Sequence, residues 1–318
     1  MTQLLAILAE PERSAMAFER LSVRFPGVKV TTGGAAVATD HAADAEILVT
    51  IGPALGRAAN QIFVAAGKLR WIQSIGTGTD NLLGHPALRP GVAVTNVRGV
   101  HGDQMSEAAI GAMLALARDL PRIVRQQAEA RWERFAPRLL AGATVGILGL
   151  GAIAAALAPR LKALGMTTVG IGGTPRALDG FDRVEPRGAL VEVAAGLDYL
   201  VVLTPYSTDT HHLVDAAVLA AMKPDACVVN LARGGVVDEA ALLIALDAGR
   251  LSGAALDVFA QEPLGADSPW WRHPRVLVTP HLGGFHAGYG EQVYTAVADN
   301  LRRYLAGGIE ALVNRVDA

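Results

Sequence analysis

Side chains with complementary chemistry stand near the ends of three apolar runs in the last third of the sequence. They are Arg233 in NLARGG, Asp257 and Glu262 in ALDVFAQEP, and His281 in VTPHLGG. A guanidinium can bind carboxylate and carbonyl oxygens, and an imidazolium can donate a proton as a hydride arrives. A carboxylate bonded to the imidazole fixes its tautomer and favours its charged form. An arginine, a carboxylate and a histidine brought together in this way suit the reduction of a 2-oxo acid.

A glycine-rich turn, Gly149-Leu150-Gly151-Ala152-Ile153-Ala154, lies between an apolar run and a helical pattern rich in alanine and leucine. In such a turn the first glycine permits the tight bend, the second lets a pyrophosphate approach the backbone, and the third position must be small. Free N–H groups at the positive end of the helix would hold the diphosphate. Because the turn joins an expected strand to an expected helix, it indicates a dinucleotide site, with a purely structural turn as the alternative.

The choice of cofactor depends on the residues directly after the next expected strand, residues 168–171. In dinucleotide sites an acidic residue at this place binds the ribose hydroxyl, yet here the sequence continues GGTPR without a carboxylate. A carboxylate would repel a 2′-phosphate, whereas an arginine with nearby hydroxyl and amide donors would bind it. We therefore predict that NADP(H) is favoured, with Arg176 and Thr174 at the phosphate. Alternatively, Arg176 is a solvated loop residue and NAD(H) serves equally well.

Short apolar runs alternate with helical patterns along almost the whole chain, which is typical of parallel sheets covered by helices on both faces. The expected strands form two series on either side of a long helix at 104–118: 4–8, 28–31, 47–51, 71–75 and 92–96, then 144–148, 168–171, 199–203, 227–231, 253–256 and 276–278. Two series predict two α/β domains instead of one. The dividing helix has an apolar face wider than one core needs, and a second long helix spans about 289–305.

The composition excludes several classes of protein. Of 318 residues, 51% are hydrophobic and 18% are charged, and the net charge is −2, so the chain is neither disordered nor a basic binder of nucleic acid. Cys227 is the one cysteine of the sequence, which leaves no internal disulfide and no cysteine-based metal centre, and we expect no metal. The N-terminal residues favour a first strand over a signal peptide, and no apolar stretch is long enough for a bilayer. We predict a cytoplasmic protein without a membrane partner.

Six motifs, in order from Trp71 to the C-terminal helix, resemble the D-isomer-specific 2-hydroxyacid dehydrogenases, a family that includes glyoxylate/hydroxypyruvate reductases and phosphoglycerate dehydrogenases. The motifs are IQSIGTGTDNL, VTNVRGVHGDQMSE, TVGILGLGAIA, VVNLARGGVVDE, AALDVFAQEPL and VTPHLGG. The resemblance implies an α/β fold of two doubly wound parallel-sheet domains with the active site in a cleft. A discontinuous, flavodoxin-like substrate domain would comprise residues 1–98 and 287–318, and a Rossmann cofactor domain residues 99–286.

The resemblance also implies a role for each matching residue. Arg233 would orient the substrate, His281 would be the acid/base and Glu262 its partner. Backbone N–H groups would bind the substrate carboxylate at Ile75, Gly76, Thr77 and Gly78. Asp257 would contact the nicotinamide amide or, alternatively, cap a loop. The residues expected to bind the cofactor are Met105, Gly149, Leu150, Gly151, Ala152, Ile153, Thr174, Arg176, Thr204, Pro205, Ala232, Asp257 and Gly283.

The expected function is an NAD(P)-dependent oxidoreductase that reduces a small 2-oxo acid, such as glyoxylate or hydroxypyruvate, to the D-2-hydroxy acid. A phosphoglycerate dehydrogenase-like enzyme and a non-enzymatic, dinucleotide-sensing protein are the alternatives. A methyltransferase also uses a glycine-rich turn, but it has no need of the histidine and the carboxylate. The resemblance and the wide apolar face of the helix at 104–118 together predict a homodimer.

Overall fold

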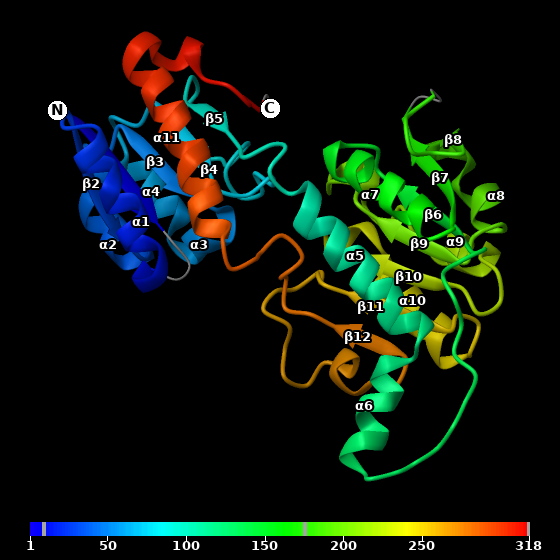
Figure 1. Cartoon of the computed structure of the whole chain (residues 1–318). Coiled ribbons are helices and arrows are strands. Elements are labelled where there is room, and N and C mark those ends of the chain that lie inside the picture. The colour runs from blue at the N-terminus through cyan, green and yellow to red at the C-terminus, as the bar shows by residue number, and fades with distance from the viewer. Residues whose placement is uncertain (8–10, 174–176, 317–318) are drawn as a thin grey trace. The chain divides into compact units, whose positions relative to one another are not determined.

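The chain divides into two compact units in the computed structural model, which describes residues 1–7, 11–173 and 177–316 (Figure 1). Unit 1 consists of Met1–Val100 and Ala287–Ala318, and unit 2 of His101–His286. The last long helix of the chain therefore belongs to the same unit as the first strand, and unit 1 is built from both ends of the sequence.

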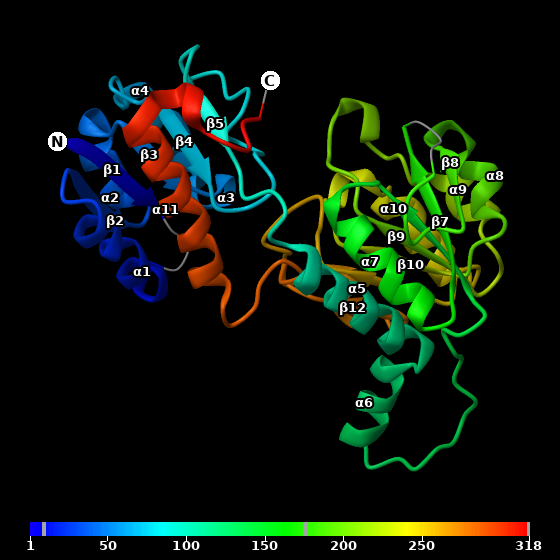
Figure 2. The same ribbon diagram turned by 45° about the horizontal axis from the view of Figure 1, so that its top comes forward.

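Unit 1 is a parallel sheet with helices on both faces. Its strands are β1 (Thr2–Ile7), β2 (Val28–Gly33), β3 (Ile47–Thr50), β4 (Trp71–Ser74) and β5 (Ala93–Thr95), and its helices are α1 (Pro11–Arg24), α2 (Ala35–His41), α3 (Gly52–Leu55), α4 (Ala59–Ala65) and α11 (Tyr289–Gly307). Successive residues of a strand point to opposite faces, so Leu4 and Ala6 pack with α1 and α11, and Leu5 and Ile7 with α2 and α4. Figure 2 shows α11 lying across the strands. The strand order β2-β1-β3-β4-β5 is that of flavodoxin-like folds.

Unit 2 is a second parallel sheet between two layers of helices. Its strands are β6 (Thr144–Leu148), β7 (Thr167–Gly172), β8 (Arg183–Pro186), β9 (Tyr199–Val202), β10 (Cys227–Asn230), β11 (Gly253–Leu256) and β12 (Val276–Val278). Its helices are α5 (Gly102–Ala117), α6 (Leu120–Ala128), α7 (Ala152–Ala163), α8 (Leu190–Ala194), α9 (Ala216–Ala221) and α10 (Glu239–Asp247). The strand order β12-β11-β10-β9-β6-β7-β8 reverses beside β6, as in Rossmann-type sheets. Helices α5 and α7 cover one face, and α8, α9 and α10 the other.

The apolar runs of the sequence are the strands of these two sheets, so the predicted α/β class with two doubly wound parallel sheets is confirmed. Strand β8 was not predicted. Its sequence is RVEP, with one exposed residue followed by three half-buried ones, and it forms the edge of the sheet beside β7. Edge strands commonly carry charged residues, which is why no apolar run marks this one.

The apolar face of α5 is used within unit 2. Met105, Ala109, Ala112, Met113, Leu116 and Ala117 pack into one cluster with α7 and the strands β6, β9, β10 and β11. Ala108 and Ile110 pack against the same cluster. Most of this face is therefore used within unit 2, because a helix that contacts both a sheet and a second helix buries more than one side.

No helix among the described residues combines the length and the apolar character that crossing a bilayer requires. Within the same residues no group of three or more His, Cys, Asp or Glu side chains is arranged to hold a metal ion. The thiol of Cys227 is buried in β10, which agrees with the apolar run in which it occurs.

Candidate active site

The glycine-rich turn joins β6 to α7 at the point where the strand order of unit 2 reverses. Gly149 has φ +103°, and a Cβ there would lie 2.7 Å from the backbone N of Thr204 and 2.8 Å from the carbonyl carbon of Leu203. The loop after β9 therefore excludes a side chain at Gly149. Gly151 precedes α7 in an extended conformation without a side-chain cap, and open space surrounds it. The first N–H groups of α7 are thus accessible to an anion.

An open cavity of about 320 Å³ lies beside this turn, a size typical of small-molecule sites. It is lined by Leu148, Gly149, Leu150, Ile171, Gly172, Gly173, Arg187 and Thr204. None of these described lining residues is acidic. Arg187 belongs to the short 3-10 helix η3 (Arg187–Ala189) that follows β8, and it was not among the predicted site residues because β8 was not predicted. Thr174 and Arg176 lie outside the described residues.

The turn and the cavity fit a dinucleotide. The helix N-terminus can bind the diphosphate, and the cavity covers the ends of β6 and β7, where the adenosine ribose binds in sheets of this order. Among the other residues expected to contact the cofactor, Ala152 is exposed in the first turn of α7 and Ile153 is half-buried. Thr204 is buried, and Pro205 after it is exposed.

Three further residues of the expected cofactor set lie on other elements of unit 2. Met105 in α5 packs against Gly283, since its Sδ would be 3.3 Å from a Cβ placed there. Ala232 precedes Arg233, and its carbonyl accepts a hydrogen bond of 2.7 Å from Nη1 of that arginine. The structure therefore brings Met105 and Gly283 together, although they are far apart in the chain.

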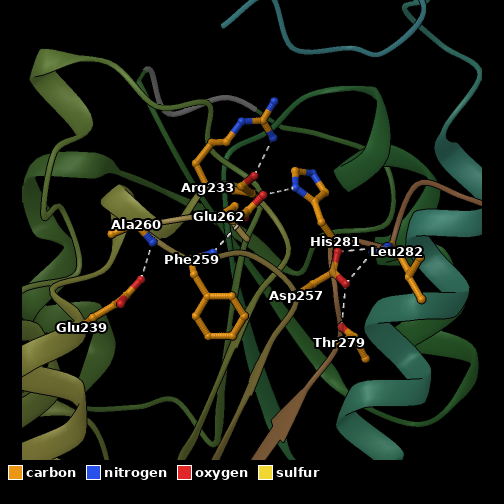
Figure 3. Close-up of polar contacts among 11 residues, drawn as sticks. Arg233, Glu239, Asp257, Phe259, Ala260, Glu262, Thr279, His281 and Leu282 are labelled. Atoms are coloured by element: carbon orange, nitrogen blue, oxygen red, sulfur yellow. Dashed lines mark hydrogen bonds and ion pairs between the residues drawn. The ribbon is translucent and has the colours of Figure 1, made fainter. Parts of the chain in front are cut away.

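Arg233, Glu262 and His281 follow the neighbouring strands β10, β11 and β12. Parallel strands end at the same edge of a sheet, and Figure 3 shows these three side chains gathered there. His281 Nδ1 lies 2.7 Å from Glu262 Oε2, which leaves Nε2 as the ring nitrogen that can exchange a proton with a ligand. The Phe259 N–H donates to Glu262 Oε1 at 2.9 Å. The structure thus places the carboxylate and the imidazole in direct contact.

Opposing effects act on the pKa of Glu262. Burial raises the pKa, but the hydrogen bonds from His281 and from the Phe259 N–H, together with the positive charge of Arg233, lower it more. The net pKa is below the ordinary value of a glutamate, so Glu262 is ionised at neutral pH. The side chains of Glu262 and His281 are 32% and 39% exposed, so a small molecule can reach the pair.

The segment that carries Glu262 is held by residues that follow β10. The Ala260 N–H donates to Oε1 of Glu239, the first residue of α10, at 2.6 Å (Figure 3). A Cβ on Gly234 would lie 1.9 Å from the carbonyl carbon of Phe259 and 2.0 Å from the N of Ala260, so the two backbones are in direct contact. Gly234 and Glu239 therefore position Glu262. Glu239 was not among the predicted site residues, although it lies in the motif VVNLARGGVVDE.

Asp257 is buried, and its carboxylate organises the loop that carries His281 (Figure 3). Oδ1 accepts hydrogen bonds from Thr279 Oγ1 at 2.5 Å and from the Leu282 N–H at 2.8 Å, and Oδ2 accepts one from the Gly283 N–H at 2.9 Å. This is the loop-capping alternative that the sequence left open for Asp257. Its contact with a nicotinamide amide stays a prediction.

The loop Ile75–Gly78 lies in unit 1, directly after β4. All four of its carbonyls accept hydrogen bonds from the protein: Ile75 from the Tyr289 hydroxyl, Gly76 and Gly78 from the Ser74 hydroxyl, and Thr77 from the Asn96 side-chain amide. Two N–H groups of the loop are also engaged within the protein: that of Ile75 donates to the Thr50 carbonyl at 2.8 Å, and that of Gly76 to Ser74 Oγ at 3.3 Å. The binding of a substrate carboxylate by this loop stays a prediction.

A family model and a set of curated proteins match this chain. The model, described as "D-isomer specific 2-hydroxyacid dehydrogenase, NAD binding domain", matches residues 110–283. The D-3-phosphoglycerate dehydrogenase of Mycobacterium tuberculosis is 36% identical over 253 residues, which cover 78% of this chain and 47% of that protein. The chain thus spans about half the length of the curated relatives it matches.

Two solved structures are similar to almost the whole chain. A D-isomer specific 2-hydroxyacid dehydrogenase family protein from Aeromonas salmonicida is 33% identical with a TM-score of 0.87, and the match covers 99% of each chain. An NADPH-dependent glyoxylate/hydroxypyruvate reductase from Sinorhizobium meliloti, in complex with NADP and sulfate, is 27% identical with a TM-score of 0.85, covering 100% of this chain and 98% of that one. Both matches extend over unit 1 and unit 2.

Proposed function

Because this chain belongs to the D-isomer specific 2-hydroxyacid dehydrogenase family, we propose that it reduces a small 2-oxo acid of the glyoxylate or hydroxypyruvate type to the D-2-hydroxy acid. The observation that carries this proposal is the 2.7 Å contact of His281 Nδ1 with Glu262 Oε2, at the sheet edge where Arg233 also lies. Similarity to the reductase of Sinorhizobium meliloti supports the class of substrate.

His281 supplies the proton of the reaction. A nicotinamide cofactor held at the glycine-rich turn would supply the hydride that adds to the carbonyl carbon of the 2-oxo acid. His281 donates a proton to the carbonyl oxygen from Nε2, since Nδ1 is engaged by Glu262. The ionised Glu262 carboxylate attracts the charge of the protonated ring and fixes its orientation. When the hydroxy acid is oxidised, the neutral ring takes up the proton at the same nitrogen.

Two groups bind the carboxylate and carbonyl oxygens of 2-oxo acids in this proposal. The Arg233 guanidinium offers paired donors that match carboxylate geometry. The N–H groups of Ile75–Gly78 in unit 1 bind a carboxylate, as the family resemblance implies.

The cofactor is proposed to be NADP(H) in preference to NAD(H). The cavity beside Gly149 has no carboxylate among its described lining residues, and Arg187 contributes a positive charge there. The similar reductase from Sinorhizobium meliloti is NADPH-dependent and was crystallised with NADP. The expected contacts of Arg176 and Thr174 with the phosphate, and of Asp257 with the nicotinamide, belong to the same proposal.

A panel of initial rates tests the proposed function. Glyoxylate, hydroxypyruvate, pyruvate and longer 2-oxo acids are each offered with NADPH and with NADH, and the product is resolved by chiral chromatography. We expect turnover of the small 2-oxo acids and formation of the D-isomer. Protein that binds NADPH but turns over no member of the panel would contradict the proposal and favour a dinucleotide-sensing protein.

A phosphoglycerate dehydrogenase-like activity is the second candidate, favoured by the similarity to D-3-phosphoglycerate dehydrogenases. A phosphorylated substrate needs further cationic groups, and Arg98 and Arg134 are the candidates that the sequence offers. Adding 3-phosphohydroxypyruvate to the same panel distinguishes the two functions. A kcat/KM for this compound well above that for hydroxypyruvate would favour the second candidate.

We also propose that the chain forms a homodimer in the cytoplasm, a compartment that the single cysteine favours. Much of the helix α5 is buried within unit 2, and a dimer through its exposed residues stays a prediction. Exposed apolar side chains also occur on α6 and in the segment after it: Leu120, Ile123, Val124, Trp132 and Leu139. Such patches commonly mark interaction sites. In sedimentation experiments we expect a dimer, with more monomer for Trp132→Ala.

A further inference from the structure

We propose that Arg187 binds the 2′-phosphate of NADP(H) and thereby determines the preference of the cofactor site. The inference rests on the proposed function, because it names the group that recognises the cofactor of that function. It starts from the cavity beside the glycine-rich turn, where Arg187 is the one charged residue among the described lining residues.

The edge strand β8 and its neighbour β7 place Arg187 at the ribose end of the cavity. In dinucleotide-binding sheets the ribose hydroxyls bind at the end of the second strand, which here is β7. Strands β7 and β8 are parallel, and Gly172, the last residue of β7, pairs with Pro186 of β8. Arg187 is the next residue after Pro186, so it leaves the sheet beside the end of β7. Both Gly172 and Arg187 line the cavity.

The guanidinium of Arg187 is not committed to another group of the protein. It has no hydrogen bond or ion pair with any residue in the described ranges, and it is half-buried. The carboxylates of Glu185, on β8, and of Asp182, just before that strand, are engaged elsewhere. Glu185 lies 3.3 Å from Arg183, and Asp182 lies 2.7 Å from Lys162 and accepts from the Thr168 N–H.

The residues opposite Arg187 leave room for a ligand. No atom lies within 4 Å of the position that a Cβ on Gly173 would take. The sequence at residues 172–176, GGTPR, contains no acidic residue. An acidic residue at this place would accept from the ribose hydroxyl of NAD(H) and repel a phosphate. The guanidinium of Arg187 offers instead two parallel donors to phosphate oxygens. NAD(H) has only a hydroxyl at that position, so the Arg187 guanidinium contributes less to the affinity for NAD(H).

Binding measurements without any 2-oxo acid test the inference. Dissociation constants of NADPH and NADH are measured by fluorescence, and those of adenosine 2′,5′-bisphosphate and 5′-AMP by competition, for the wild type, Arg187→Met and Arg187→Lys. For Arg187→Met we expect about 10- to 100-fold weaker binding of the two 2′-phosphorylated compounds, and less than a twofold change for the other two. Arg187→Lys keeps the charge but not the paired donors, and its binding should be intermediate.

Arg183→Met is the matched control, because Arg183 lies on β8, directly before the 3-10 helix that carries Arg187, and is paired with Glu185. It should change none of the four constants, and circular dichroism checks that each variant is folded. Equal weakening of all four ligands by Arg187→Met, or no weakening at all, would overturn the inference, whatever the turnover panel gives. Conversely, loss of the 2′-phosphate preference in a protein that reduces no 2-oxo acid would support the inference and count against the proposed function.

Discussion

The backbone N–H of His281 donates to the carbonyl of Asp257 at 2.8 Å, while the carboxylate of the same Asp257 binds the N–H groups of the two residues after His281. His281 has φ +55°, a left-handed conformation that costs a residue with a side chain roughly 1–3 kcal/mol. One buried residue therefore holds both sides of a strained turn, and this turn directs the imidazole towards Glu262.

Replacing Asp257 with Asn should impair catalysis by loosening this turn. The amide has one acceptor oxygen where the carboxylate has two, so at least one of the three hydrogen bonds is lost. We expect kcat to fall roughly 10- to 100-fold, with a smaller change in KM for the 2-oxo acid. Thr279→Val removes a single donor and should have a weaker effect in the same direction. If Asp257 acts mainly through the nicotinamide, the Kd of NADPH will rise instead and kcat at saturating cofactor will change little.

Replacing His281 with Ala should lower kcat for reduction by about 10²- to 10⁴-fold and leave the Kd of NADPH unchanged, because the ring acts in proton transfer. In the wild type, reduction should decline at high pH, since the protonated ring of His281 is needed. Oxidation of the hydroxy acid should increase over the same range. Initial rates in both directions between about pH 5 and 9 test this, and flat profiles in both would argue against His281 as the acid/base.

The Glu262–His281 pair should also contribute to stability in a pH-dependent way. The pKa of Glu262 in the folded chain lies below the 4.5 of a free glutamate. Its contribution is therefore fully present above the ordinary glutamate pKa and is lost as pH falls through the lower folded-state pKa. Thermal unfolding of the wild type and Glu262→Gln should give a higher Tm for the wild type at about pH 6, with the difference shrinking towards about pH 3. A difference that persists unchanged at acidic pH would refute this.

Replacing Glu239 with Ala should reduce turnover although Glu239 is separated from the imidazole by the 259–262 segment. The Ala260 N–H loses its acceptor, and Glu262 becomes less well positioned. We expect kcat to fall about 3- to 10-fold with a shifted pH profile, and Glu239→Gln, which keeps an acceptor oxygen, to restore most of the activity. Glu192→Ala removes a carboxylate of α8 and serves as the control. An unchanged pH profile in Glu239→Ala would point to a structural role alone.

Gly234→Ala should destabilise the fold and lower activity together. The added Cβ would stand 1.9 Å from backbone atoms that cannot rotate away, which forces the chain after β11 to shift and costs about 1–3 kcal/mol. Gly111→Ala in α5 is the matched control, since no atom lies within 4 Å of its Cβ position. Alanine in a helix should stabilise there by about 0.5–1 kcal/mol. Urea unfolding of the three proteins measures both effects, and equal stability of Gly234→Ala and wild type would contradict the close contact.

The sequence by itself determined the parts of this protein that depend on local pattern. Apolar runs such as Cys227–Asn230 indicate strands buried on both faces, and the spacing of Gly149, Gly151 and Ala154 requires a tight turn before a helix. Since each parallel strand ends at the same sheet edge, the residues after β10, β11 and β12 could be expected to lie near one another.

Only the tertiary structure decided which groups touch. Strand β8 has a polar edge sequence, so it depends on pairing with β7. The position of Arg187, directly after β8, depends on the same pairing. Asp257 could have faced a ligand or capped a loop, and the position of the 279–283 segment selected the cap. The wide apolar face of α5 suggests a surface for another chain, yet α7 covers part of it. Local pattern determines which side chains are buried. The partner that buries each side chain depends on which strands and helices lie next to one another in the folded chain.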